Sequence, residues 1–179
     1  MLNIELRRPR SEDIDELFEF FQIMVKDTYI KEGIGDKLED LEIEILVKKK
    51  YLLEDLNTKG EKRYFLIAIC QDKIIGTIAY GPANEIIMSC LPQSESVVHE
   101  LGTVFVHPEN QYQGIGNLLL KSMYQEMSNH GIKQFWLDSG YKRAQYIWQK
   151  KFGEPEIFLK DYWEKDAHHM IWKVNVPVE

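Results

Sequence analysis

Hydrophobic residues recur at the spacing of an α-helix in four stretches of the chain: residues 11–29, 38–56, 115–130 and 141–152. The first stretch places its hydrophobic residues at Ile14, Leu17, Phe18, Phe21, Met24 and Val25. We expect Ser11 to cap this helix, with Glu12 and Asp13 in the first turn, where a helix favours negative charge. Gly131 is expected to end the third helix.

Seven other stretches alternate hydrophobic and polar residues or form short apolar runs, as strands do: residues 3–8, 63–70, 73–80, 97–106, 133–138, 155–163 and 168–176. Gln71 and Asp72 separate two of them and predict a hairpin. Residues 81–96 form a long connection, which is either a functional lid or a surface loop. The predicted order is β-α-α-β-β-β-α-β-α-β-β. It indicates an α+β fold with a mixed sheet, and we expect residues 1–179 to form a single domain.

The composition narrows the class of protein. Of the 179 residues, 44% are hydrophobic and 28% are charged, which is typical of a globular protein with a substantial core. The net charge of −7 argues against nucleic acid as a partner, because nucleic-acid-binding surfaces are usually basic. The basic run at residues 48–50 predicts a solvated helix face. No apolar run approaches the about 20 residues that span a bilayer, and the start resembles no secretory signal. We therefore expect a cytoplasmic protein with no membrane partner.

The two cysteines are too few for a disulfide framework. Cys70 lies in an apolar run, so we expect it to be a buried, reduced thiol.

A strand, a turn with two glycines and the start of a helix follow one another between Val106 and Asn117. The first turn of a helix has unpaired N–H groups and a partial positive charge, and glycines let a phosphate approach them. Gly114 and Gly116 fit this role, with Gln111 and Asn117 as polar flanks. The alternative is that the glycines only serve a tight turn. Leu119 rules out the nicotinamide fingerprint, and Asn117 after Gly116 rules out a P-loop.

The segment "VHPENQYQGIG" resembles the pyrophosphate-binding motif of the GNAT superfamily of acyl-CoA-dependent N-acyltransferases. Gln111, Gly114 and Gly116 fill the three defined positions of that motif, and Leu118 follows where the family helix begins. The resemblance implies a mostly antiparallel sheet flanked by helices. It also implies acetyl-CoA as co-substrate, held at the pantetheine arm by the strand backbone. The cofactor-binding residues that it implies are Val104, Phe105, Val106, Gln111, Tyr112, Gln113, Gly114, Ile115, Gly116, Asn117, Tyr141 and Ala144.

Acetyl transfer to an amine needs a base for the amine and a donor for the oxyanion. By resemblance, the backbone N–H of Phe105 or Val106 is the oxyanion donor. Glu100 lies eleven residues before Gln111, where some family members place a catalytic Glu. Burial in an apolar strand would raise the pKa of Glu100, which suits a base. The alternative is a surface Glu at the strand end. His99 could serve instead, but alternation places it on the opposite face.

Residues 141–153, "YKRAQYIWQKKFG", resemble the second half of the family pattern, with Ala144 in place and Phe152 before a glycine. Tyr141 stands where Asn is usual. Trp148 stands where the family often has the Tyr that protonates the leaving thiolate, and Trp has no acidic hydroxyl. A water, or no acid at all, would then serve the thiolate. We expect Trp148 to be a packing residue, with a cofactor contact as the alternative.

The acceptor site, by resemblance, lies between the first helices and the last hairpin. The substrate-binding residues expected there are Tyr29, Glu32, Tyr162 and Trp163, with Asp36, Glu164 and Asp166 nearby. Acidic and aromatic side chains suit a cationic amine, such as a polyamine, an amino sugar or a peptide N-terminus. The alternative is an ordinary surface. We expect no metal site at His168 and His169, because adjacent strand residues point to opposite faces.

Two function classes follow. The first is an N-acetyltransferase that moves an acetyl group from acetyl-CoA to a primary amine of a small molecule or peptide by direct attack on the thioester. The second is a non-catalytic acyl-CoA-binding sensor on the same scaffold. Either a monomer or a homodimer is compatible with the sequence.

Overall fold

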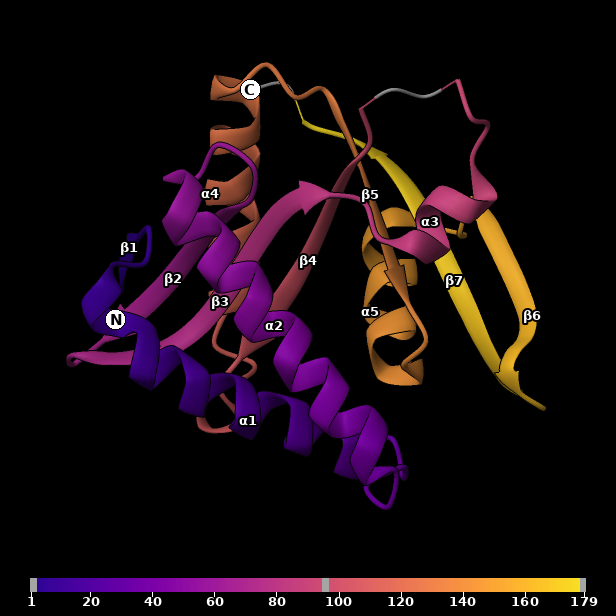
Figure 1. Ribbon diagram of the computed structural model, residues 1–179, viewed down its shortest axis with the longest axis horizontal. Coiled ribbons are helices and arrows are strands. Elements are labelled where there is room, and N and C mark those ends of the chain that lie inside the picture. The colour runs from indigo at the N-terminus through magenta and orange to yellow at the C-terminus, as the bar shows by residue number, and fades with distance from the viewer. Residues whose placement is uncertain (1–2, 95–96, 178–179) are drawn as a thin grey trace. The chain divides into compact units, whose positions relative to one another are not determined.

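The computed structural model describes residues 3–94 and 97–177, and its seven strands form one sheet in the order β1-β2-β3-β4-β5-β7-β6 (Figure 1). The strands are β1 (Glu5–Arg7), β2 (Tyr64–Cys70), β3 (Lys73–Pro82), β4 (His99–Val106), β5 (Gln134–Ser139), β6 (Ile157–Glu164) and β7 (Ala167–Asn175). The helices are α1 (Ile14–Lys31), α2 (Leu38–Thr58), α3 (Glu85–Cys90), α4 (Ile115–Asn129) and α5 (Lys142–Phe152). The predicted α+β class with a mixed, mostly antiparallel sheet is confirmed.

The chain divides into two compact units, Met1–Tyr80 with Thr103–Glu126, and Gly81–Gly102 with Met127–Glu179. Strand β4 and helix α4 each contribute residues to both units. The single domain over residues 1–179 stays a prediction.

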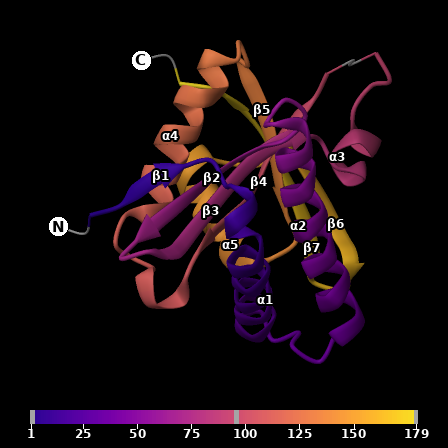
Figure 2. The same cartoon turned by 60° about the vertical axis from the view of Figure 1, so that its left-hand side comes forward.

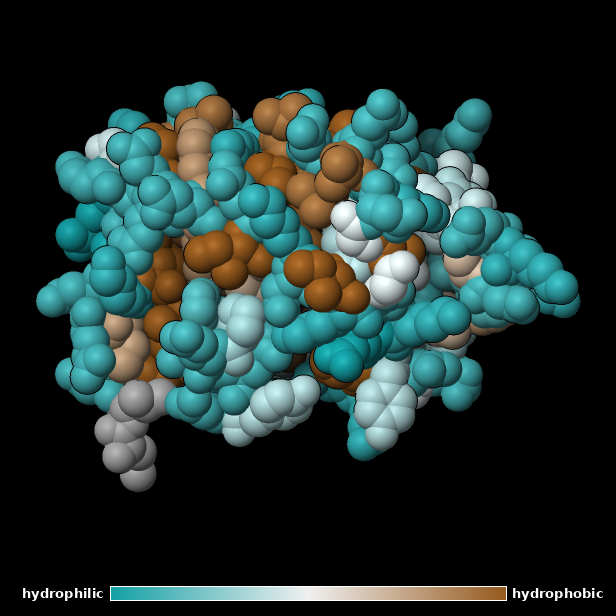
Figure 3. All heavy atoms as spheres, turned by 90° about the horizontal axis from the view of Figure 1, so that it is seen from below, coloured by the Kyte–Doolittle hydropathy of each residue, from teal (hydrophilic) through white to brown (hydrophobic). Residues whose placement is uncertain are grey.

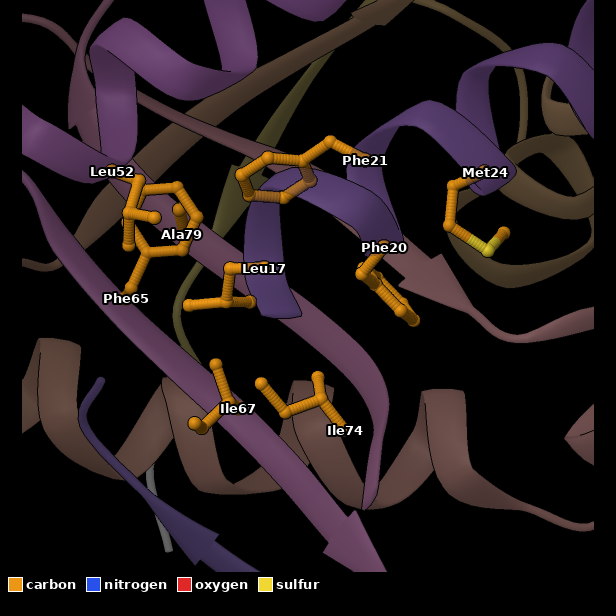
Figure 4. Close-up of a cluster of buried hydrophobic side chains, with 9 residues drawn as sticks. All are labelled: Leu17, Phe20, Phe21, Met24, Leu52, Phe65, Ile67, Ile74 and Ala79. Carbon is orange, nitrogen blue, oxygen red and sulfur yellow. The ribbon is translucent and has the colours of Figure 1, made fainter. Parts of the chain in front are cut away.

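The first unit is built on the β2–β3 hairpin and the helix pair α1 and α2, which lie side by side (Figures 1 and 2). Gln71 and Asp72 form the predicted turn, with φ values of 49° and 59° that match the twist of a two-residue hairpin. The hydrophobic stripes of the helices meet the hairpin in one buried cluster (Figure 4). Its members are Leu17, Phe20, Phe21, Met24, Leu52, Phe65, Ile67, Ile74 and Ala79.

The start of α1 differs from the prediction that Ser11 caps it. A short 3₁₀ turn, Ser11–Asp13, precedes the helix, and the Asp13 carboxylate accepts the backbone N–H of Arg10 at 2.7 Å. The Arg7 guanidinium also donates to both oxygens of Asp13, at 2.7 and 2.9 Å. These bonds hold the pKa of Asp13 below its usual range. The two arginines and Asp13 thus fix the entry to α1, a role that a neutral Ser side chain could not fill.

The end of α2 is fixed by a buried ion pair. Asp55 is fully buried, accepts the guanidinium of Arg8 at 2.7 Å, and also accepts the backbone N–H of Phe65 at 2.8 Å. Arg8 in turn lies over the Tyr64 ring, 5.2 Å from its centre. A buried carboxylate is tolerated only when it is paired in this way, so these contacts tie α2 to the sheet.

The basic run on α2 is paired rather than simply solvated. Lys48 forms an ion pair with Glu44 at 2.9 Å, and the Lys49 ammonium lies 4.7 Å from the centre of the Phe18 ring.

Hydrophobic side chains also reach the surface between charged ones (Figure 3). On α1 and α2 the large exposed ones are Ile23, Ile30, Leu38, Ile43, Leu46 and Leu53. Within residues 3–94 and 97–177, no helix combines the length and apolar character needed to cross a membrane.

The second unit contains the antiparallel strands β5, β7 and β6. Its buried cluster joins Ile87 of α3 with Val98, Trp136 and Ile171. Residues 81–96 were expected to form a lid or a surface loop, but part of this connection forms α3, with Asn84 as its N-cap. The Asn84 side chain accepts the N–H of Ile87 at 3.0 Å, which explains why the helix begins there.

We expect Asp13→Asn to lower the free energy of unfolding by about 1.5–3 kcal/mol at pH 7, because it removes hydrogen bonds to an ionised carboxylate. Asp13 has a lowered pKa in the folded protein, so its contribution is complete above its unfolded pKa. The contribution is lost as the pH falls through the folded pKa. Denaturant unfolding at a series of pH values should therefore show the two proteins converging in acid.

Glu12→Gln is the matched control, because Glu12 is an exposed neighbour in the same turn. A loss that is equally large for both variants, or that persists in acid, would contradict the role given to Asp13.

Candidate active site

The glycine loop (residues 111–117) joins the 3₁₀ turn Pro108–Asn110 to the start of α4 at Ile115. Gly114 has a φ of 83°, in the left-handed region that favours glycine. A Cβ on Gly114 would meet no atom within 4 Å, and one on Gly116 would meet only a Val106 methyl carbon, at 3.9 Å. The space beside both glycines is therefore open. Because the first N–H groups of a helix have no partner within it, this loop has the chemistry of a phosphate site.

Gln111 closes the loop onto β4 and brings a cation beside it. Its side-chain amide donates to the carbonyl oxygen of Val106 at 3.1 Å, and its amide oxygen accepts Lys31 Nζ at 3.5 Å. Lys31 is also paired with Asp27 at 2.6 Å. Tyr112 is 99% exposed, and Gln113 donates to the carbonyl of Glu109 at 3.3 Å. The side chain of Gln111 thus shapes the loop and places the Lys31–Asp27 ion pair beside it.

The backbone of β4 is irregular just before Val104. Thr103 has a φ of 52°, which is uncommon for a β-branched residue, and its carbonyl accepts the hydroxyl of Thr77 at 2.8 Å. Val104, Phe105 and Val106 follow and are half-buried. A residue in this conformation turns the next peptide groups away from the regular ladder. Such a strand segment can offer backbone donors and acceptors to a ligand.

Glu100 is 8% exposed and belongs to a connected polar cluster in the second unit, so the alternative of a surface Glu is wrong. The backbone N–H of Asn84 donates to Glu100 Oε2 at 2.7 Å. The side-chain amide of Asn84 donates to both carboxylate oxygens of Asp138, at 3.1 Å each. His169 Nε2 lies 2.7 Å from Asp138 Oδ2, and Trp163 Nε1 donates to His169 Nδ1 at 3.2 Å. We call these five residues the Asn84 cluster.

The cluster fixes the tautomer of His169. An indole N–H can only donate, so Nδ1 of His169 must accept it, and the proton of the neutral ring lies on Nε2, facing Asp138. A Cβ on Gly140 would lie 2.5 Å from Trp163 Nε1. Glycine at this position is therefore what lets the indole reach the imidazole.

His99, the other base considered on β4, is half-buried, and burial lowers its pKa. It would be neutral at pH 7. Glu100, the next residue in the chain, belongs to the Asn84 cluster through its bond to the Asn84 N–H.

The remaining cofactor residues predicted in the second unit lie at the start of α5. Tyr141 is the N-cap residue, and its N–H donates to Ser139 Oγ at 3.0 Å. Ala144 lies one turn into the helix. Trp148 stacks on Phe152, with ring centres 5.8 Å apart and planes at 18°, as expected of a packing residue.

The predicted acceptor residues fall into two kinds of environment. Tyr29 is buried at 5% exposure in the first unit, and Glu32 is the C-cap of α1. Tyr162 and Trp163 are 46% and 57% exposed on β6, with ring centres 5.0 Å apart in an edge-to-face arrangement. Only the pair on β6 therefore presents aromatic rings to solvent.

Asp161, Asp166 and His168 come within 4.8 Å of one another, a spacing that would allow a metal. Two of the candidate ligand atoms also accept backbone hydrogen bonds within the hairpin. His168 Nδ1 accepts the N–H of Asp161 at 2.9 Å, and Asp161 Oδ1 accepts the N–H of Asp166 at 2.8 Å. These bonds hold the irregular end of the β6–β7 hairpin. His168 and His169 contact different carboxylates, as strand alternation predicts.

Sequence reasoning missed Lys31 beside the glycine loop of the first unit. In the second unit it missed Asn84, Asp138 and His169 as a partner of Asp138. Asn84 carries a signal that could have revealed it, because Asn before an acidic residue and an apolar pair is a helix start. Asp138 and His169 come together only through the pairing of β5 with β7, which the sequence does not specify.

The order of the elements and the glycine loop between β4 and α4 are those of acyl-CoA-dependent transferases. The model of the acetyltransferase (GNAT) family matches residues 19–153, and the chain belongs to this family. The resemblance inferred from the sequence is thus confirmed. No curated protein matches the sequence closely enough to count as a relative.

Solved structures share the fold at low sequence identity. The PaiA N-acetyltransferase of Thermoplasma acidophilum, solved in complex with coenzyme A, has a TM-score of 0.68 and 21% identity, over 97% of this chain and 100% of that one. A GNAT-family acetyltransferase of Streptococcus pneumoniae has a TM-score of 0.67 and 18% identity, over 98% and 100%. The ribosomal-protein-S18-alanine N-acetyltransferase of Escherichia coli has a TM-score of 0.61 and 13% identity, over 99% and 96%.

We expect Gly116→Val to abolish the rise in melting temperature that acetyl-CoA causes, while the free protein melts nearly as before. A ligand at 100 times its Kd adds about 2.7 kcal/mol to stability, so the shift is easily measured in the wild type. The side chain would fill the open space beside the loop, where only Val106 is near.

Gly35→Val is the matched control, because a Cβ there also makes only ordinary contacts, the nearest at 3.5 Å to Ile30. An undiminished shift in Gly116→Val would rule out the glycine loop as the phosphate site.

Proposed function

We propose that the protein transfers an acetyl group from acetyl-CoA to a primary amine by direct attack of the amine on the thioester. The observation that carries this proposal is the open glycine loop at the start of α4, in a chain that belongs to the GNAT family. The coenzyme A bound to the Thermoplasma acetyltransferase, which shares the fold, supports the choice of cofactor. A cytoplasmic location, where acetyl-CoA is available, is part of this proposal.

The residues of the glycine loop would hold the pyrophosphate through their backbone N–H groups. The backbone of Val104 and Val106 would hold the pantetheine arm. The N–H of Phe105 or Val106 would stabilise the oxyanion that forms when the amine attacks the carbonyl carbon. The cofactor-binding residues outside the strand would be those of the glycine loop and two at the start of α5: Gln111, Tyr112, Gln113, Gly114, Ile115, Gly116, Asn117, Tyr141 and Ala144.

Glu100 would be the general base. The N–H of Asn84 stabilises its ionised form, which is the form that accepts a proton, and its low exposure keeps competing water away. No residue is assigned to protonate the leaving thiolate. Trp148 offers no acidic proton, and a thiolate leaves without one.

The acceptor would be a cationic primary amine on a small molecule or a peptide. Tyr162 and Trp163 offer exposed aromatic faces, and the carboxylates of Glu164 and Asp166 follow them in the chain. Tyr29 and Glu32, in the first unit, are the other acceptor residues predicted from the sequence. The acceptor named for the Escherichia coli enzyme of the same fold, an alanine of a ribosomal protein, illustrates a peptide amine.

A non-catalytic acyl-CoA sensor is the second candidate, and Trp148 at the usual Tyr position is the observation that favours it. A single assay separates the two candidates. Free thiol released from acetyl-CoA is measured with ethylamine, benzylamine, 1,4-diaminobutane, glucosamine and an alanine-led peptide. Thiol release that depends on an amine supports the transferase. Tight acetyl-CoA binding without release for any amine supports the sensor.

We expect Glu100→Gln to lower turnover by about 10²–10⁴-fold, the usual contribution of a general base, and to leave acetyl-CoA binding intact. Steady-state kinetics with the best amine of that panel, together with the thermal shift, give both quantities. Glu61→Gln, at an exposed position of the first unit, is the control. Turnover close to that of the wild type would assign the base to another group.

A further inference from the structure

Strand β6 carries an irregular segment that directs Trp163 onto β7. Leu159 faces His169 and Glu164 faces Ala167, so five steps along β6 are matched by two steps along β7. Asp161, in the middle of the extra length, has a φ of 52°. Bulges of this kind re-aim side chains and are frequent beside active sites.

Trp163 lies over His169 but is weakly held there. Its side chain is 57% exposed, and its polar contact is the 3.2 Å bond from the indole N–H to His169 Nδ1. His169 itself is 4% exposed and is held by Asp138 at 2.7 Å. The imidazole is thus fixed from the side of Nε2, while its Nδ1 is covered by a side chain that is more than half exposed.

A neutral imidazole whose Nε2 proton faces a carboxylate is a proton acceptor at Nδ1, because the carboxylate stabilises the imidazolium that forms. The indole N–H occupies that nitrogen with a single hydrogen bond. An ammonium group presents the same kind of donor with a full positive charge, so it can replace the indole.

We infer that Trp163 is a movable cover of His169, and that His169, held by Asp138, takes the first proton from the acceptor ammonium as the acceptor displaces the indole. This inference rests on the proposed acetyl transfer. The ammonium loses one proton to Nδ1 and becomes the neutral amine. That amine forms the N–C bond as the C–S bond breaks, and Glu100 accepts the second proton from nitrogen. One proton finally reaches the thiolate and the other returns to solvent from His169.

In this scheme His169 accepts the first proton from the acceptor and Glu100 accepts the second. The titratable groups placed against His169 are Asp138 on β5 and Tyr162 on β6, whose ring centre lies 5.6 Å away. Glu100 is linked to His169 through two residues, Asp138 and Asn84. The acceptor class is a primary amine that is protonated in solution and can lie against the exposed rings of Tyr162 and Trp163.

His169→Gln tests the task of His169, because the Gln amide can still donate to Asp138 but has no basic nitrogen. With the best amine of the panel, we expect kcat/KM for the amine to fall about 100-fold at pH 7. The loss should shrink as the pH approaches the amine's own pKa, where the neutral amine is already present. The loss of kcat/KM in Glu100→Gln should remain at that pH, because the neutral amine still has its second proton to lose. Acetyl-CoA should stabilise His169→Gln as it does the wild type.

Trp163→Phe tests whether the indole covers His169, because it removes the indole N–H and keeps an aromatic face. We expect the KM for the amine to fall, because the indole no longer competes with the ammonium for Nδ1 of His169. Nitrogen-15 NMR of the free wild type should show His169 with its proton on Nε2, independently of any activity.

Several results would overturn the inference. These are a proton on Nδ1 of the free protein, a KM that rises in Trp163→Phe, a His169→Gln variant with wild-type kinetics, or a loss that does not change with pH. In each case thiol release by the wild type would leave the proposed acetyl transfer standing. A wild type that releases no thiol with any amine would refute both.

Discussion

The left-handed conformation of Thr103 in the middle of β4 is the constraint on which the proposed chemistry depends. Such a conformation costs about 1–3 kcal/mol, and the Thr77 hydroxyl, at 2.8 Å from the Thr103 carbonyl, offsets part of that cost. Before Thr103, β4 carries Glu100 and pairs in parallel with β5. After it, the strand continues through Val104–Val106 to the glycine loop. One strand therefore holds a buried acid at one end and, at the other, the backbone groups proposed to bind the cofactor.

The polar groups of the second unit are organised around Asn84. Its backbone and side chain together contact Glu100, Asp138 and the first turn of α3. The carboxylate of Glu100 is buried and that of Asp138 is half-buried, which would be unfavourable if they were not hydrogen-bonded, and Asn84 donates to both of them. The short helix that follows Pro82 thus positions the residues proposed to handle protons. The bulge in β6 adds an aromatic cover to the same cluster.

Much of the fold could be predicted from the sequence, because helical periodicity, strand alternation and glycine positions are local signals. The long helices, the Gln71–Asp72 turn and the strand that precedes the glycine loop all come from such signals. The cap of α1 was predicted wrongly at Ser11, because the Asp13 bonds to Arg7 and Arg10 depend on how β1 enters the helix. The pairing of Asp138 with His169 could not be predicted for a similar reason, since it requires β5 and β7 to be neighbours. Local patterns specify elements, while contacts between distant elements require the strand order.

The central claim is that the backbone of the glycine loop and of the strand before it binds the cofactor, and an amide NMR titration with coenzyme A tests it most directly. Phosphate binding at a helix start acts on the N–H groups themselves, so their signals report the contact without relying on activity. The account predicts that the largest shifts fall at residues 104–106 and 111–117, and that they saturate together. Shifts that are absent there, or that concentrate on α1 and α2, would contradict it.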